Sequence, residues 1–145
     1  MTTAMQLTDG LWVAGQVSPE DIKEIAQNGV KTIICNRPDG ESMDQFSYQE
    51  IEQAAKAAGL EAAYCPVVSG HMTKEDVTLF KHLAQSLPSP QLAYCRSGMR
   101  STTLWALSQS GEQPADILLA IAANAGYDLS PLRHQFEMDF ANKAQ

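Results

Sequence analysis

Short apolar runs alternate with amphipathic segments along the chain, and the two patterns predict strands and helices in turn. The apolar runs predict strands at residues 11–14, 30–35, 62–68 and 92–95. We expect the first of these at an edge of the sheet and the run at 62–68 to be buried. Residues that recur at helical spacing predict helices over 19–28 and 48–58, and further helices that begin near residues 73, 100, 114 and 130.

The starts of two helices carry clear local signals. Ser18 precedes Pro19 and two acidic residues, which is typical of a capped first turn. Thr73 stands three residues before Asp76, the spacing of a capping box. The regular alternation of strand and helix predicts a single α/β domain over residues 1–145, with a central, mostly parallel sheet of four or five strands and helices on both faces.

Composition and charge exclude several classes of function. The net charge of −7 and the absence of a broad basic face argue against a nucleic-acid partner. No apolar run approaches the length of a membrane span, and the start of the chain does not resemble a secretory signal, so we expect a cytoplasmic protein with no membrane partner. The histidines are scattered, and no cysteine pair has metal-ligand spacing, so we expect neither a metal nor a cofactor.

The chain has three cysteines, Cys35, Cys65 and Cys95, spaced by 30 residues. Each is expected at the carboxyl end of a strand, and that edge is where ligands bind in open α/β sheets. Three of the arginines of this acidic chain, Arg37, Arg96 and Arg100, also follow strands. We therefore expect the functional site at this edge of the sheet.

The segment from Cys95 to Ser101 carries the strongest chemical signal. A strand ends in Cys95, a loop follows, and a helix begins near Arg100, so loop amides and the helix N-terminus converge on one point and stabilise negative charge there. This predicts Cys95 as a thiolate nucleophile and Arg100 as a two-oxygen clamp. Ser101 is expected to donate a hydrogen bond to the thiolate or to a leaving sulfur. The residues between Cys95 and Arg100 form the loop that we expect to bind the anion, here called the cradle: Arg96, Ser97, Gly98 and Met99. Gly98 supplies the turn, and Met99 lines the mouth of the site.

Residues 94–101, YCRSGMRS, resemble the active-site loops of dual-specificity protein phosphatases and of rhodanese sulfurtransferases. The segments 11–16, 29–41, 66–70 and 125–129 are similar to the phosphatase-like domain of beta-lactamase hydrolase-like proteins, a bacterial family, and the similarity spans about residues 8–136. The resemblance implies a cysteine-based phosphatase fold. It also implies hydrolysis of a phosphate monoester, on a small molecule or a phosphoprotein, through a phosphocysteine.

The loop also departs from the phosphatase pattern. Four residues separate Cys95 from Arg100, whereas classical tyrosine phosphatases have five, and rhodanese loops are of the shorter kind. Two alternatives therefore stand beside the phosphatase: a rhodanese-like sulfurtransferase that carries a persulfide on Cys95, and a non-catalytic module that binds an anion or a phosphopeptide.

A phosphatase also needs an acid that protonates the leaving oxygen. In dual-specificity enzymes this aspartate lies in the loop that here follows the strand ending near Val68, but that loop contains none. We expect either His71, in the same loop, or Asp39, in the turn after the strand at 30–35, to serve as the acid. Glu41, close to Asp39 at the same edge, is a third candidate for this acid.

The architecture that the resemblance implies places the strand of Cys95 between those of Cys35 and Cys65. Neighbouring strands lie about 4.8 Å apart, within the range of Cα separations of about 4.4–6.8 Å that a disulfide needs. An accessible thiolate oxidises readily. The resemblance therefore makes Cys65, and after it Cys35, a possible redox partner of Cys95.

Overall fold

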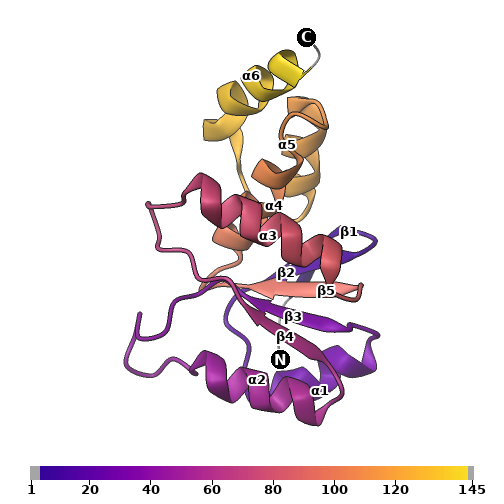
Figure 1. Ribbon diagram of the computed structural model, residues 1–145, viewed down its shortest axis with the longest axis vertical. Helices are drawn as coiled ribbons and strands as arrows, with labels where there is room; N and C mark the ends of the chain where they lie inside the picture. The colour runs from indigo at the N-terminus through magenta and orange to yellow at the C-terminus, as the bar shows by residue number, and fades with distance from the viewer. Residues whose placement is uncertain (1–3, 144–145) are drawn as a thin grey trace.

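The computed structural model describes residues 4–143, and its centre is a five-stranded sheet (Figure 1). Strand β1 pairs antiparallel with β2, and every other pairing in the sheet is parallel. The order across the sheet is β1-β2-β5-β3-β4. The strands are β1 (Ala4–Thr8), β2 (Leu11–Ala14), β3 (Thr32–Cys35), β4 (Glu61–Tyr64) and β5 (Gln91–Tyr94). The prediction of a mostly parallel α/β fold is confirmed.

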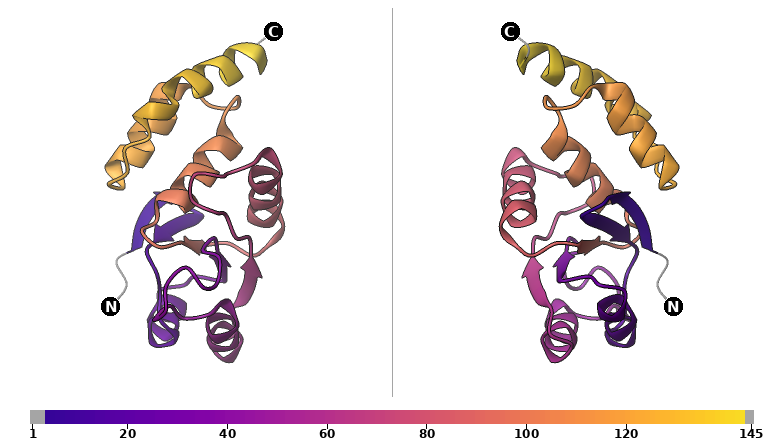
Figure 2. Two further views of the ribbon diagram at one scale, coloured as in Figure 1. Left: turned by 90° about the vertical axis from the view of Figure 1, so that its left-hand side faces the viewer. Right: turned by 90° about the vertical axis from the view of Figure 1, so that its right-hand side faces the viewer.

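Helices cover both faces of this sheet. Helices α1 and α2 lie against one face and α3 and α4 against the other, while α5 and α6 stack beyond α4, at the end of the molecule farthest from α1 and α2 (Figures 1 and 2). The helices are α1 (Pro19–Gln27), α2 (Tyr48–Ala57), α3 (Lys74–Ser86), α4 (Met99–Gln109), α5 (Ala115–Asn124) and α6 (Arg133–Lys143), with a short 3₁₀ turn, η1 (Ser130–Leu132), before α6.

Alternating side chains of the strands fill two apolar cores. Ile33 and Tyr94 face the core under α1 and α2, whereas Ile34 and Ala93 face the core under α3 and α4. The predicted caps form as expected: the Ser18 hydroxyl accepts the Asp21 N–H at 3.2 Å, and an equivalent capping box starts α3. Local signals therefore fix the helix starts, and strand periodicity decides which side chains face which core.

Two predictions about strands are wrong. The structure adds β1, so β2 is an inner strand instead of the expected edge; β1, with the sequence AMQLT, lacks a run of β-branched residues such as the one in β3. The predicted buried strand at 62–68 ends at Tyr64, and its residues are half-buried or exposed because β4 lies at the outer edge. Val67 is buried, but it belongs to the loop that follows.

The expected order of the cysteine-bearing strands is also wrong. Strand β3 lies between β5 and β4, so the strand that ends in Cys35 separates Cys95 from Cys65. The shared edge, however, is confirmed: Cys35 is the last residue of β3, and Cys65 and Cys95 directly follow β4 and β5. The loops that follow these strands meet at one end of the sheet, on the left in Figure 1.

Candidate active site

Cys95 lies at the start of a loop that curves back, so that the backbone of the loop faces the Cys95 sulfur. The chain leaves β5, passes through Gly98 in a left-handed conformation (φ 96°) and enters α4, for which Gly98 is the N-cap. In this geometry the Gly98 N–H donates to Cys95 Sγ at 3.1 Å. Cys95 has 0% of its surface exposed, so its sulfur is buried, in contrast to the accessible thiol that we expected. A backbone N–H and a helix N-terminus thus face the same sulfur atom.

Arg100, in the first turn of α4, is oriented by two partners outside its own loop. Its Nη1 donates to the Val67 carbonyl at 2.8 Å and to Glu41 Oε2 at 2.7 Å, and its Nη2 donates to Glu41 Oε1 at 2.9 Å. A guanidinium has five N–H donors, and these three bonds leave the Nε–H and the second Nη2–H. Cys95 is close enough to raise the pKa of Arg100, although the bond to Glu41 is the larger cause. The remaining donors can hold two oxygens of an anion beside the sulfur.

Glu41 joins the arginines that follow β3 and β5. Besides Arg100 it accepts from Arg37 Nε at 3.0 Å, and the buried Arg37 donates in turn to Gln16 Oε1 at 3.0 Å. The bond from Arg100 lowers the pKa of Glu41, burial opposes this shift, and Arg37 adds to the lowering. Glu41 is therefore held as a carboxylate, which is unsuited to donating a proton.

Ser101 bonds to the neighbouring strand. Its hydroxyl donates to Asn36 Oδ1 at 2.8 Å, and Asn36 Nδ2 donates to the Cys65 carbonyl at 2.9 Å. A hydroxyl carries a single proton, so in this arrangement Ser101 does not donate to Cys95 as its sequence position suggested. Asn36, which the sequence did not single out, ties α4 to β3 and the chain after β4.

The two expected acids have different surroundings. The Asp39 carboxylate accepts the Tyr48 N–H at 2.8 Å, at the start of α2, and the Asp39 N–H donates to the Tyr64 hydroxyl at 3.0 Å. His71 is exposed in the loop between β4 and α3, the loop whose Val67 carbonyl binds Arg100. Asp39 therefore acts as a helix cap, whereas the His71 ring lies in solvent.

The remaining loop residues form the outer wall of the cradle. The Arg96 carbonyl accepts the Gln16 N–H at 3.2 Å, and this strand-to-loop approach requires Gly15, because a Cβ there would lie 2.9 Å from the Arg96 oxygen. The Ser97 hydroxyl accepts the Met99 N–H at 3.3 Å. The Arg96 and Met99 side chains are exposed, as expected for residues at the mouth of the site.

Tyr127 is a site residue that no local signal revealed. It lies in the loop between α5 and η1, and its hydroxyl donates to the Ser97 carbonyl at 3.0 Å. Burial raises the pKa of Tyr127, and the charge of Cys95 adds to this shift. Only the tertiary fold brings residues 97 and 127 together.

The predicted redox pairs meet a geometric obstacle. Cys65 lies on the same side of the sheet as Ala93, but Asn36, after the intervening strand β3, stands between Cys65 and Cys95, so their Cα atoms are about 9–10 Å apart, two strand spacings. Cys35 is in register with Tyr94 and shares its core, so its side chain points to the opposite face from Cys95. All three cysteines are free. The expected pairing of Cys65 with Cys95 required their strands to be neighbours, and the observed strand order separates them.

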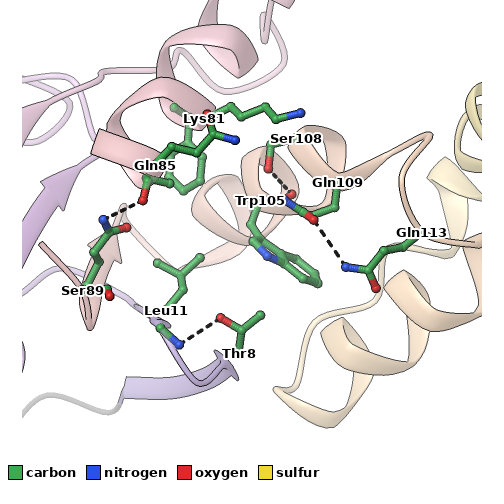
Figure 3. Close-up of a pocket in the computed structure, with 13 residues that line it drawn as sticks. Thr8, Leu11, Lys81, Gln85, Ser89, Trp105, Ser108, Gln109 and Gln113 are labelled. Carbon is green, nitrogen blue, oxygen red and sulfur yellow. Dashed lines mark hydrogen bonds between the residues drawn. The ribbon is translucent and has the colours of Figure 1, made fainter. Parts of the chain in front are cut away.

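A separate cavity of about 370 Å³ lies at the other end of the strands, where β2 and β5 begin (Figure 3). Its lining includes Leu11 at the start of β2, Trp105 and Gln109 from α4, and Gln85 from α3. None of the predicted site residues lines it. Within residues 4–143 no group of three or more His, Cys, Asp or Glu side chains is arranged to hold a metal ion, and no helix is long and apolar enough to cross a membrane.

The fold and the site together define the class of protein. A buried cysteine follows the central strand of the sheet, and an arginine lies in the first turn of the next helix. The fold is that of the cysteine-based phosphatases of the protein-tyrosine and dual-specificity type. PTPMT1, solved in complex with PI(5)P, shares it with a TM-score of 0.67 and 18% identity over 98% of this chain and 99% of that chain. A crystal structure of a phosphatase candidate from Neisseria meningitidis Z2491 has a TM-score of 0.85 and 35% identity over 93% of this chain and 96% of that chain.

The chain belongs to the family of the beta-lactamase hydrolase-like protein, phosphatase-like domain, whose model matches residues 4–112. The beta-lactamase hydrolase-like protein of Xylella fastidiosa strain Temecula1 is 30% identical over 127 residues, which are 86% of this chain and 30% of that protein. The chain thus spans less than a third of the length of this relative. The family resemblance and the fold expected from the sequence are both confirmed.

Proposed function

We propose that the protein is a cysteine-dependent phosphatase that hydrolyses a phosphate monoester through a phosphocysteine on Cys95. The observation that carries the proposal is the hydrogen bond from the Gly98 N–H to Cys95 Sγ at the start of α4, next to Arg100. An N–H donor and a helix N-terminus stabilise a thiolate, and the same groups attract a phosphate. Membership of a phosphatase-like family supports this reading.

The reaction takes place in two displacements. The Cys95 thiolate attacks phosphorus, an S–P bond forms, and the bond from phosphorus to the ester oxygen breaks while an acid protonates that oxygen. The free donors of Arg100 and the loop amides hold the equatorial oxygens during this step. Water then attacks phosphorus and passes a proton to the conjugate base of that acid, the S–P bond breaks, and inorganic phosphate and the Cys95 thiolate are released.

His71 is the acid that we favour. Glu41 is held as a carboxylate by two arginines, and the Asp39 carboxylate is already bonded to the Tyr48 N–H at the N-terminus of α2. The His71 loop is anchored at the site by the bond from Arg100 to the Val67 carbonyl. His71→Gln is expected to reduce kcat on a poor leaving group more than on an activated aryl phosphate, whereas Asp39→Asn should affect both equally.

The substrate that we propose is a phosphorylated small molecule or a phosphoprotein. Among proteins with this fold, PTPMT1 has been solved with PI(5)P and SIW14 of S. cerevisiae is a PP-IP phosphatase. In the chain itself Glu41 offsets the charge of Arg37 and Arg100. One carboxylate balances only one of these two guanidinium charges, and the net positive charge that is left suits one phosphate group better than a substrate with several phosphates.

Sulfur transfer is the second candidate, because only four residues separate Cys95 from Arg100. The deciding experiment measures turnover of an aryl phosphate and cyanide-dependent transfer from thiosulfate on the same preparation, with Cys95→Ser as the control. We expect the phosphatase activity to be the larger and to need Cys95. If thiocyanate forms rapidly and aryl phosphate is not hydrolysed, the protein is a sulfurtransferase instead. If the protein binds phosphate but shows neither activity, it is a binding module.

A further inference from the structure

Tyr127 reaches the loop around Cys95 from a segment beyond residues 4–112, the part of the chain that matches the family model. Helix α5 ends at Asn124, Gly126 reverses the chain two residues later with a φ of 96°, and the Tyr127 N–H bonds to the Ala122 carbonyl at 2.9 Å. Leu129 is buried in the core under α4 and anchors the segment. Tyr127 is thereby held in one position, with its hydroxyl 3.0 Å from the Ser97 carbonyl oxygen.

The acceptor of that bond and the donor to Cys95 belong to one peptide group. The Ser97 carbonyl receives the Tyr127 hydroxyl, and the Gly98 N–H of the same peptide donates to Cys95 Sγ at 3.1 Å. The hydroxyl, the peptide and the sulfur therefore form a continuous chain of hydrogen bonds. Bonds in such a chain polarise one another, so a donor on the carbonyl strengthens the bond from the N–H to the sulfur.

The tyrosine side chain also restricts the peptide sterically. A Cβ built on Gly98 would collide with the hydroxyl and the ring of Tyr127. The side chain is thus packed directly against Gly98 and opposes rotation of the peptide away from Cys95. The hydrogen bond and the packing act in the same direction.

We propose that Tyr127 is a positioning residue for Cys95: it fixes and polarises the Ser97–Gly98 peptide so that the N–H stabilises the thiolate. The proposal rests on the proposed role of Cys95 as nucleophile, and it makes the C-terminal helical segment a part of the site. The titratable or charged groups that act on Cys95 are Arg100 from α4, Cys35 at the end of β3 and Tyr127 itself, and Glu41 acts through Arg100.

The test replaces Tyr127 by Phe, which keeps the ring and removes the hydroxyl. Thiolate formation at Cys95 is followed by its ultraviolet absorbance against pH, in a Cys35→Ser, Cys65→Ser background, so no turnover is needed. We expect the midpoint to rise by about 0.5 pH unit, and the rate of aryl phosphate turnover below the midpoint to fall about threefold, a deficit that disappears at higher pH. Tyr127→Leu, which also removes the ring, should shift the midpoint at least as far.

Tyr48→Phe is the matched control, because it removes a hydroxyl that donates to Glu52 on the same helix and does not touch the loop. An unchanged midpoint in folded Tyr127→Phe, equal to that of Tyr48→Phe, overturns the positioning role. A shifted midpoint in a protein that hydrolyses no aryl phosphate upholds the role of Tyr127 and overturns the proposed phosphatase activity instead.

Discussion

Cys95 and Cys35 end neighbouring strands at the same edge of the sheet and both are buried, yet their sulfur atoms have opposite hydrogen-bond partners. Cys35 Sγ donates to the Arg37 carbonyl at 3.2 Å, whereas Cys95 Sγ accepts the Gly98 N–H at 3.1 Å. A carbonyl acceptor favours the thiol and an N–H donor favours the thiolate. Burial raises the pKa of Cys35 to about 11. Because the two cysteines are alike in burial and strand position, we expect the segment that follows the strand to decide which of them is reactive.

Cys65 differs from Cys95 in the same way as Cys35 does. Burial raises the pKa of its thiol to about 11, and its sulfur lies 3.9 Å from the Asp76 carbonyl oxygen, again an acceptor. After Cys35 and Cys65 the chain continues through irregular loops, and the next helices begin only at Tyr48 and Lys74. After Cys95 it turns through Gly98 directly into α4, so a helix N-terminus faces the sulfur.

Replacing the cysteines gives the largest expected effect. Cys95→Ser should reduce aryl phosphate turnover by at least ~10³-fold, because the nucleophile is lost. Cys35→Ser, at an equally buried position, should keep most of the activity. Steady-state kinetics of the two variants measures the contrast, and comparable losses would show that Cys95 has no special role.

Arg100 lies close to Cys95 in the first turn of α4, so its replacement sharpens the comparison next. Arg100→Lys loses the planar fork and should reduce kcat by about 10²–10³-fold, the range for removing a charge-assisted transition-state contact. Arg96→Lys is the control, since the Arg96 side chain is exposed and only its carbonyl is used in the loop. Full activity in Arg100→Lys together with loss in Arg96→Lys would reverse the assignment.

Ser101 and Asn36 form the polar contact between α4 and the strand of Cys35. Ser101→Ala leaves Asn36 Oδ1 buried without this donor and should lower the free energy of unfolding by about 1–3 kcal/mol. Ser108→Ala, which removes a buried hydroxyl bonded within its own helix, should cost less. Urea unfolding compares them. A drop in rate without a loss of stability in Ser101→Ala would instead restore a direct role at the sulfur.

Glu41 links the arginines that follow the two cysteines, and its replacement has the smallest expected effect. Because its pKa is lowered in the folded protein, its contribution to stability is fully present above its ordinary value of 4.5 and is lost as the pH falls through the lowered value. Glu41→Gln should therefore be less stable by about 1 kcal/mol at neutral pH, with the difference vanishing in acid.

Glu112→Gln is the control for this measurement, since Glu112 pairs with Lys81 at 3.2 Å on the surface and should contribute less than about 0.5 kcal/mol. Unfolding by urea at neutral and acidic pH gives both differences. A stability loss in Glu41→Gln that is independent of pH would mean that its charge does not hold Arg100.

The sequence allowed the local parts of the site to be predicted. Cys95, Gly98 and Arg100 lie within six consecutive residues, and a glycine between a strand and a helix is a sufficient signal for the turn that aims the amides at the sulfur. The capped starts of α1 and α3 were predictable for the same reason, since Ser18 and Thr73 bond to backbone only three residues away. Such interactions need no knowledge of the tertiary fold.

The contacts that complete the site join residues far apart in the sequence, and no local pattern encodes them. Glu41 meets Arg100 across 59 residues and Tyr127 meets Ser97 across 30. The order of parallel strands is likewise set by how the helices cross the sheet, so the positions of Cys35 and Cys65 relative to Cys95 could not be read from their equal spacing. Strand β1 was missed because its pattern is weakly apolar.

The most direct test of the account measures which of the three thiols reacts first. The protein is treated with iodoacetamide at about pH 6, where only a stabilised thiolate is appreciably ionised, and the labelled peptides are mapped by mass spectrometry. Because all three cysteines are almost completely buried, exposure does not favour any one of them. The account predicts that Cys95 is labelled first and that phosphate protects it. Preferential labelling of Cys35 or Cys65 would contradict it.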